Sequence, residues 1–505
     1  MEKSTLHISQ LPNELLFMII EALQDDVETN KRSGGPDIKN CRLVCRRFCD
    51  LSSRLLVRSV QVGHSHASLD RLNAIARHAS ISLGVRTIEV VLSSYLPFKP
   101  SLEGKRDFIN LQLKWLPKSV QLFEVGRMRN LTESDAQVLH KAHEVLSCWR
   151  YMVQEPRMQP SPRGDLALHR ILTEKAFQTF QKLAQEQESL VRGAMEQAIA
   201  SALLRMPWVR RLTFDDTHTY GFLRRRLSRE TSSTVVEGIY QNTLLPLTRR
   251  DLGQRPPGSF SDNSNYFGLL ETTPRVLAAV GGTSQVLLKS LEVDVEMIAL
   301  NRIFLDTPDL QRKVISATKK LTDLSIKQKK KWAREPVEEL FLGHCCTSPD
   351  LRTYSVALET GKYSVSHLFT GPGAKEQRES LTVIQVSGAD IRVLELKQFL
   401  KAIPDVLDRV ELSSVRLVGG SWREVLDMLR EKTYRESKDW AYPVRIFEAI
   451  NPDPSHPLSR TFDEIFESDA TWEVSDADAY VLRHKEVNPF APEAGNFPQG
   501  HTFNG

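Results

Sequence analysis

Residues 381–432, LTVIQVSGADIRVLELKQFLKAIPDVLDRVELSSVRLVGGSWREVLDMLREK, alternate between two short apolar strand patterns and two helical patterns. The strand patterns LTVIQV and LDRVEL begin at 381 and 407, 26 residues apart, and each has apolar residues at its first, fourth and sixth positions. A capping-box spacing of Ser421 and Glu424 starts the second helix. The first helix is indicated by apolar residues that recur with the helical period, namely Val393, Leu396, Phe399, Leu400 and Ile403. The stretch therefore predicts a strand–helix–strand–helix unit.

The same strand phrase returns along the chain as VRTIEV at 85, VRRLTF at 209, LKSLEV at 288 and LTDLSI at 321. Each is similar to the strand L-x-x-L-x-L of a leucine-rich repeat, and the interval of 26 residues lies within the roughly 20–29 residues of such repeats. Other intervals are longer, such as 33 residues between 288 and 321, so we expect an irregular solenoid with insertions. IRVLEL at 391 also fits the phrase, but its helical period predicts a helix.

Two amphipathic helices are predicted within the first 60 residues, separated by the polar stretch QDDVETNKRSGGPD. LPNELLFMIIEAL, residues 11–23, has Pro12 in its first turn and apolar residues at helical spacing. The second helix is predicted to start near Ile38 with Asp37 as N-cap and to continue through Val44, Phe48, Leu51 and Leu55. A module of this size cannot bury all its apolar surface, so one face is expected to bind a partner as a helix in a groove.

The pattern Leu11-Pro12-x-Glu14-Leu15-Leu16, followed by RLVCRRFCDL at 42–51, resembles the F-box, and DVETNKRSGG resembles an insertion between its helices. The resemblance implies docking on the Skp-type adaptor of a cullin–RING ubiquitin ligase, while the rest of the chain captures an unknown protein substrate. With its repeats, the chain is similar to fungal F-box proteins that carry degenerate leucine-rich repeats. By this resemblance, the residues expected to meet the adaptor are Leu11, Pro12, Leu15, Leu16 and Ile19, with Ile38, Val44 and Phe48 packing beside them. The implied set is Leu11, Pro12, Leu15, Leu16, Ile19, Leu23, Ile38, Val44 and Phe48.

A chain of 505 residues exceeds the roughly 250–300 at which one core stops growing, so several units are expected. We expect an α/β (α+β) fold: an F-box at 5–58, a mostly helical linking region at 59–205 with a strand near 85–92, and a repeat region at 206–450. Short helices are expected at 102–159, and one helical block at 166–206. Residues 451–505 are expected to form an acidic, proline-containing, partly disordered tail, anchored on the repeats by Trp472, Tyr480 and Val481.

Composition and motifs favour no chemistry of the chain's own. The net charge of +4 gives no reason to expect a nucleic-acid partner. The sequence has no apolar run of the kind found in signal peptides or membrane-spanning helices, so we expect a soluble protein of the cytoplasm or nucleus with no membrane partner. Cys41, Cys45 and Cys49 are spaced along one helical face, which suits buried apolar packing better than a metal site. HKAHE at 140–144 lacks the zinc-protease spacing. No catalytic, cofactor or metal site is therefore expected.

Three functions are compatible with these patterns. The first is a non-enzymatic substrate receptor of the ligase, in which proximity of target and conjugating enzyme replaces catalysis by this chain. The second is an F-box scaffold that binds the adaptor without degradation of a client, which recovery of ubiquitinated clients would distinguish from the first. The third is an unrecognised enzyme in residues 100–206, which a convergent set of titratable groups in a deep pocket would favour.

Overall fold

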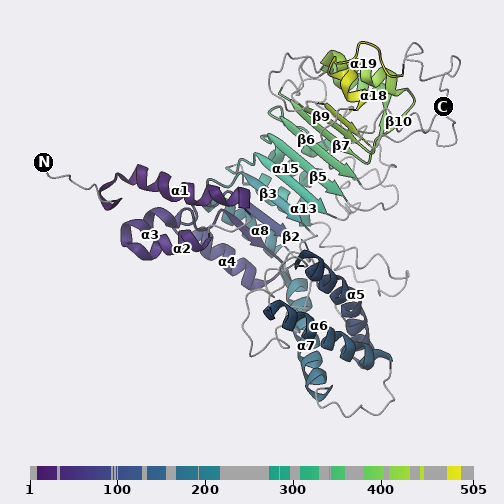
Figure 1. Ribbon diagram of the computed structural model, residues 1–505. Helices are drawn as coiled ribbons and strands as arrows, with labels where there is room; N and C mark the ends of the chain where they lie inside the picture. The colour runs from purple at the N-terminus through teal and green to yellow at the C-terminus, as the bar shows by residue number, and fades with distance from the viewer. Residues whose placement is uncertain are drawn as a thin grey trace.

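The computed structural model describes residues 8–30, 35–92, 95, 98, 100–127, 133–154, 166–190, 193–215, 272–283, 285–295, 307–328, 341, 343–358, 380–402, 409–432, 444–447 and 475–490. These residues form a mixed α/β structure with three parts: an N-terminal group of helices, a long parallel sheet flanked by helices, and a separate helical layer (Figure 1). Within these ranges, no helix is long and apolar enough to cross a membrane.

The parallel sheet contains nine strands whose spatial order follows their order in the sequence. Every neighbouring pair is parallel, so the chain returns to the same end of the sheet before each strand. The strands are, in order, β1 (Ser59–Val62), β2 (Thr87–Val91), β3 (Arg211–Asp215), β4 (Ser290–Val295), β5 (Asp323–Gln328), β6 (Thr353–Leu358), β7 (Val383–Ser387), β9 (Arg409–Ser413) and β11 (Val444–Phe447). Two short strands, β8 (Asp390–Arg392) and β10 (Arg416–Val418), form a second parallel pair.

One face of the sheet is covered by a row of helices. From α4 to α15 each helix contacts the next, and α18 contacts α19; the buried residues of all these helices share one apolar core with the inward residues of the strands. The helices described along this row are α4 (His66–Arg77), α8 (Ala194–Arg205), α13 (Thr272–Gly281), α15 (Pro308–Thr318), α18 (Val393–Ala402) and α19 (Trp422–Lys432). The other face of the sheet carries mostly polar side chains, as the alternating burial of the strands requires.

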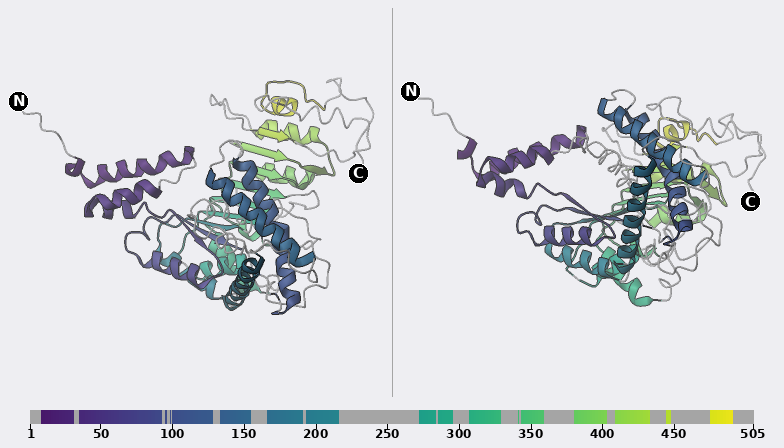
Figure 2. Two further views of the ribbon diagram at one scale, coloured as in Figure 1. Left: turned by 60° about the horizontal axis from the view of Figure 1, so that its bottom comes forward. Right: turned by 90° about the horizontal axis from the view of Figure 1, so that it is seen from below.

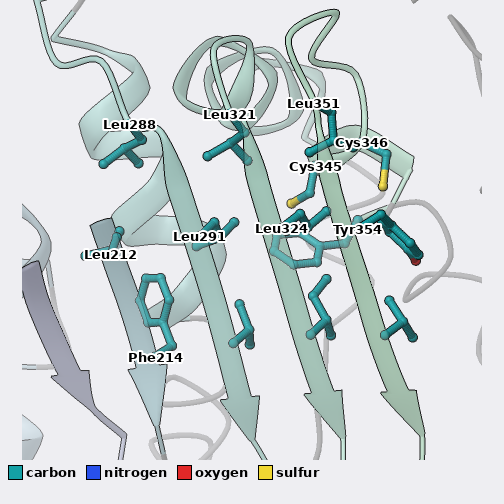
Figure 3. Packing of buried hydrophobic residues seen from close by; sticks show 14 of the residues in the cluster. Leu212, Phe214, Leu288, Leu291, Leu321, Leu324, Cys345, Cys346, Leu351 and Tyr354 are labelled. Atoms are coloured by element: carbon teal, nitrogen blue, oxygen red, sulfur yellow. The ribbon is translucent and has the colours of Figure 1, made fainter. Parts of the chain in front are cut away.

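In-register pairing stacks the apolar residues of the strands into continuous columns (Figure 3). One column contains Val60, Ile88, Leu212, Leu291, Leu324, Tyr354, Ile384 and Val410, all buried. A second column two residues later contains Val62, Val90, Phe214, Val293, Ile326, Val356, Val386, Leu412 and Ile446. Each strand therefore buries its apolar side only because the strands on both sides continue the column.

All six predicted strand phrases form strands of this sheet, and the pairing of Val383 with Arg409 confirms the interval of 26 residues. The Ser421 hydroxyl accepts a hydrogen bond from the amide of Glu424 at 3.4 Å, which is one of the two bonds of the predicted capping box. The carboxylate of Glu424 pairs with Lys397 of α18. The helix predicted for IRVLEL exists as α18, but the first residues of the phrase belong to β8. The sequence reading missed β1, β6 and β11. β1 and β2 lie before residue 206, where the repeat region was expected to begin, and belong to the same sheet as β3.

The helical layer lies between β2 and α8 in the sequence and has a core of its own (Figures 1 and 2). It consists of α5 (Leu102–Arg127), α6 (Glu133–Gln154) and α7 (Leu166–Leu190), so the expectation of only short helices at 102–159 is wrong. Trp149, Phe108 and Phe180 are buried at its centre. The single helical block predicted for 166–206 is interrupted at Gly193, whose φ is 105°. Before it, α7 packs in this layer, whereas α8 after it packs on the sheet.

The C-terminal end of the sheet is covered by α21 (Asp476–Val481). Tyr480 donates a hydrogen bond to Asp427 of α19 at 2.6 Å, and the side chain of Asp478 accepts one from the amide of Ile446 in β11 at 2.9 Å. Val481 is buried in the core of the sheet. The predicted anchoring by Tyr480 and Val481 is thus confirmed, while Trp472 and the rest of the tail outside 475–490 lie beyond the described residues.

We predict that Leu324→Ala lowers the free energy of unfolding by about 2–5 kcal/mol, because it opens a cavity in the middle of an apolar column. Ser325→Ala, one residue further along β5 and on the polar face, is the matched control and should change it by less than about 0.5 kcal/mol. Urea denaturation followed by circular dichroism measures both. Equal midpoints for the two variants would contradict the assignment of the buried face.

We also predict an acid-dependent loss of stability caused by His64, which follows β1 and is buried. Burial lowers the pKa of His64 from 6.5 to about 4, against a smaller opposing effect of a hydrogen bond to the backbone of Val91. Because the unfolded chain binds the proton more tightly, stability falls by about 3 kcal/mol as the pH drops from 6.5 to 4. His64→Gln should flatten this slope in denaturation curves recorded at each pH, whereas His66→Gln, at an exposed histidine, should leave it unchanged.

Candidate functional site

The N-terminal module contains three helices: α1 (Asn13–Asn30), α2 (Gly35–Val44) and α3 (Arg46–Ser53). Their common core is formed by Leu16, Ile20, Ile38 and Phe48. The prediction of one continuous second helix is wrong, because Cys45 adopts an extended conformation (φ −163°, ψ 170°) between α2 and α3. Asp37 lies in the first turn of α2 and not at its N-cap. The helix α1 continues to Asn30, through half of the expected insertion.

Arg47 joins the start of α3 to the start of α1. Its Nε donates to the side-chain oxygen of Asn13 at 2.7 Å, and its Nη2 donates to the backbone carbonyl of Leu11 at 2.5 Å. Two donors of one planar guanidinium thus fix the orientation of α1 at its N-terminus, a geometry that lysine cannot reproduce. This role of Arg47 was not predicted from the sequence, although the residue belongs to the RRF segment of the motif.

One side of α1 is apolar and exposed to solvent. Leu15, Ile19 and Leu23 recur every four residues and remain 46%, 44% and 41% exposed, while Leu16 and Ile20, on the adjacent side, are buried. Of the 16 large apolar side chains exposed among the described residues, seven lie within the first 44 positions. They are Ile8, Leu15, Met18, Ile19, Leu23, Leu43 and Val44, and we refer to them as the apolar face of the module.

The structure divides the predicted partner-binding set into two groups. Leu15, Ile19, Leu23 and Val44 belong to the apolar face, Pro12 is exposed, and Leu11 is half-buried. Leu16, Ile38 and Phe48 are instead buried in the core of the module, so these three position the helices and offer no surface to a partner. For Leu16 this corrects the expected direct contact. The sequence reading also missed Met18 and Leu43, whose exposure depends on how the helices pack.

The cysteines of the module do not behave as expected. Cys45 is exposed and Cys41 and Cys49 are half-buried, so the expectation of three buried packing residues is wrong, and the extended backbone at Cys45 is the reason. Within the described ranges, no group of three histidine, cysteine or acidic residues is placed to hold a metal ion.

The HKAHE segment lies on α6 in the helical layer. Glu144 accepts a hydrogen bond from Lys141 at 2.8 Å, and its other oxygen lies 3.3 Å from Nε2 of the buried His169 on α7. The hydrogen bond from Lys141 is the main reason that the pKa of Glu144 lies below its usual value. These contacts connect two helices and show no arrangement of a nucleophile with a base.

The polar face of the sheet offers a second, broader surface. Glu292 on β4 pairs with Arg211 on β3 and lies 3.9 Å from Lys327 on β5. Gln61 on β1 donates to Glu89 on β2 at 2.9 Å. These side chains pair across neighbouring strands, so the face is already organised as rows of polar and charged groups. Such a surface suits recognition of a polar partner more than the binding of an apolar one.

Compared with known proteins, the chain matches no family model, no curated protein and no solved structure.

We predict that Arg47→Ala loosens the start of α1, because both bonds that hold it are lost. Hydrogen–deuterium exchange of the amides of residues 13–20 should become at least several times faster, while exchange in the sheet stays constant. Arg46→Ala, at the exposed neighbouring position, is the control. The same exchange rates in wild type and Arg47→Ala would show that the guanidinium does not hold the helix.

Proposed function

We propose that this chain is a substrate receptor of a Skp–cullin–F-box ubiquitin ligase, which binds the Skp adaptor through residues 5–58 and an unknown target protein through the sheet region. The observation that carries the proposal is the apolar face of the module. A small helical unit keeps Leu15, Ile19 and Leu23 in solvent although its own core is complete. A concentrated exposed apolar surface of this kind marks an interaction site.

The energetics of the apolar face support binding of a protein partner. Full burial of one leucine, isoleucine or valine contributes about 1.5–3 kcal/mol, so the partly exposed Leu15, Ile19, Leu23 and Val44 together offer several kcal/mol to an interface. Part of this is offset by the cost of association. Leu15 lies in the LPNELL segment and Val44 in the LVCRRF segment, and these are also the segments that resemble the F-box.

The sheet supports the second half of the proposal. Strands in sequential order, all parallel and backed by helices on one face, are the arrangement that a leucine-rich-repeat-like solenoid requires. Its outer face displays charged rows that include Arg211, Glu292 and Lys327. In this proposal the target lies against that face or the loops beside it, in the cytoplasm or nucleus. The chain supplies proximity, and the ubiquitin-transferring enzymes supply catalysis.

We predict that Ile19→Glu combined with Val44→Glu lowers the affinity for the Skp adaptor at least tenfold, because two charges would then be buried against an apolar groove. Both side chains are exposed, at 44% and 65%, so the substitutions spare the core of the module. Binding of the purified full chain to the adaptor, measured by biolayer interferometry, tests this.

The matched control is Ile171→Glu, which changes an isoleucine of α7 that is 65% exposed and lies outside the module. It should bind the adaptor as the wild type does. The assignment of the module fails if the wild type does not bind the adaptor, or if the double variant binds it with unchanged affinity.

A further inference from the structure

A pocket of about 470 Å³ lies where the N-terminal module meets the first strands of the sheet. Its walls come from four separate segments: α1, the end of α3 with the turn after it, the loop before β2, and the loop before β3. The volume is that of a site for a small molecule or for one side chain of a larger ligand. The lining residues are Phe17, Glu21, Arg54, Leu55, Arg58, Leu83, Gly84, Arg86 and Trp208.

The walls are held together by close packing of backbone. A Cβ atom at Gly84 would lie 1.6 Å from the carbonyl oxygen of Arg54, so only glycine lets the loop before β2 approach the end of α3 this closely. Two residues after Gly84 in the same loop, the Arg86 guanidinium lies 5.5 Å from the centre of the Trp208 ring. Nη1 of Arg86 also donates to the carbonyl of Leu83 at 2.8 Å. The shape of the pocket is therefore fixed by the packing between the N-terminal module and the first strands of the sheet.

The charge of the lining is strongly positive. Arg54, Arg58 and Arg86 face a single carboxylate, Glu21, which leaves a net charge of +2. The pKa of Arg86 is lowered, first by burial and then by the positive charges of Arg58 and Arg210, while Glu21 opposes this shift. The hydrogen bond from Arg86 to Leu83 is explained by a role in holding the loop before β2 in place. That role does not explain why Arg54 and Arg58, which come from the segment after α3, also line the pocket.

The positive charge continues along the starting edge of the sheet. The backbone amide of Arg86 donates a hydrogen bond to the carbonyl of Arg58 at 2.8 Å. In the same way, the amide of Arg210 donates to the carbonyl of Arg86 at 3.0 Å, and the amide of Lys289 donates to the carbonyl of Arg210 at 2.8 Å. These four residues occupy the same position in consecutive repeats, and we call them the basic row. Because neighbouring strands lie about 5 Å apart, the row places one cationic residue at each such step.

We propose that this pocket binds a phosphate group of a phosphorylated ligand, with a further negative group of the same ligand lying along the basic row. A phosphate ester carries a charge of about −1.5 to −2, which matches the net charge of the lining better than the single charge of a carboxylate. Guanidinium groups bind phosphate through paired, parallel hydrogen bonds, and three arginines line the pocket. The ligand is either a small polyphosphate or a phosphorylated protein segment.

The pocket lies on a different side of α1 from most of the apolar face of the module. Phe17 and Glu21 lie on a different side of α1 from Leu15, Ile19 and Leu23, since successive residues of a helix are rotated by about 100°. Occupation of the pocket is therefore compatible with a partner on the apolar face, and the proposal does not depend on the proposed ligase function.

The test is isothermal titration calorimetry of the full chain at low and at physiological salt. The probes are inorganic tripolyphosphate and a glycine–serine peptide with one phosphoserine, together with the same peptide unphosphorylated. We expect binding of at least one phosphorylated probe, weakened by salt, and no binding of the unphosphorylated peptide. Stronger binding of tripolyphosphate indicates a small ligand, and stronger binding of the phosphopeptide indicates a protein segment.

Three variants locate the site, and their melting temperatures check that each is folded. Arg54→Gln with Arg58→Gln, at two exposed side chains, should weaken binding at least about tenfold. Glu21→Gln removes the opposing carboxylate and should tighten binding about two- to fivefold, a gain that structural damage does not produce. Arg423→Gln, an exposed arginine on α19 at the other end of the sheet, should have no effect. The proposal is overturned if the wild type binds neither phosphorylated probe, or if the arginine double variant binds as the wild type does.

Discussion

A parallel strand of three to six residues cannot bury its apolar side by itself, and the whole structure depends on how this chain meets that constraint. Each strand places its apolar residues in register with those of the next, so that columns such as Leu291–Leu324–Tyr354 run across the sheet. Parallel pairing requires the chain to return to the same end each time, and among the described connections helices such as α4, α13 and α18 make that return. The columns leave unpaired edges at both ends, which is why the ends of the sheet need cover. At the C-terminal end, α21 provides it through Tyr480 and Asp478.

The same register also aligns the polar and charged side chains of the sheet. Because equivalent positions lie side by side, a residue type repeated at one position becomes a row across the sheet. Apolar residues form the core, and Glu292 and its neighbours form the paired charges of the outer face. The basic row at the starting edge consists of Arg58, Arg86, Arg210 and Lys289. The helical layer of 102–190 leaves this order intact, because it is inserted between β2 and β3, whose strands still pair directly. Large insertions are tolerated at such points because they do not interrupt the columns.

Much of the sheet could be predicted from the sequence, and the failures have a common physical cause. The six phrases that were recognised all became strands, since apolar residues at the first, fourth and sixth positions match the pleat of a strand that follows a turn. The segments around Val60 and Tyr354 have the same spacing but were not recognised, and IRVLEL matched the phrase yet became mostly helix. Three apolar positions are a weak local signal. The neighbouring strand, which is distant in the sequence, decides whether the segment is recruited to the sheet.

Local periodicity determined where helices and strands form, because it depends on residues that are close in the chain: the amphipathic helix at 13–23, the unit at 381–432 and the capping box at Ser421 all follow from it. Only the tertiary structure decided which apolar residues remain exposed. Leu15 and Leu16 are adjacent and chemically identical, yet the packing of α1 on α2 and α3 buries one and leaves the other in solvent. The pocket shows the same dependence, since Glu21, Arg58, Arg86 and Trp208 meet only after the module has packed against the sheet. A local pattern carries no information about such contacts, because they are set by the packing of segments far apart in the chain.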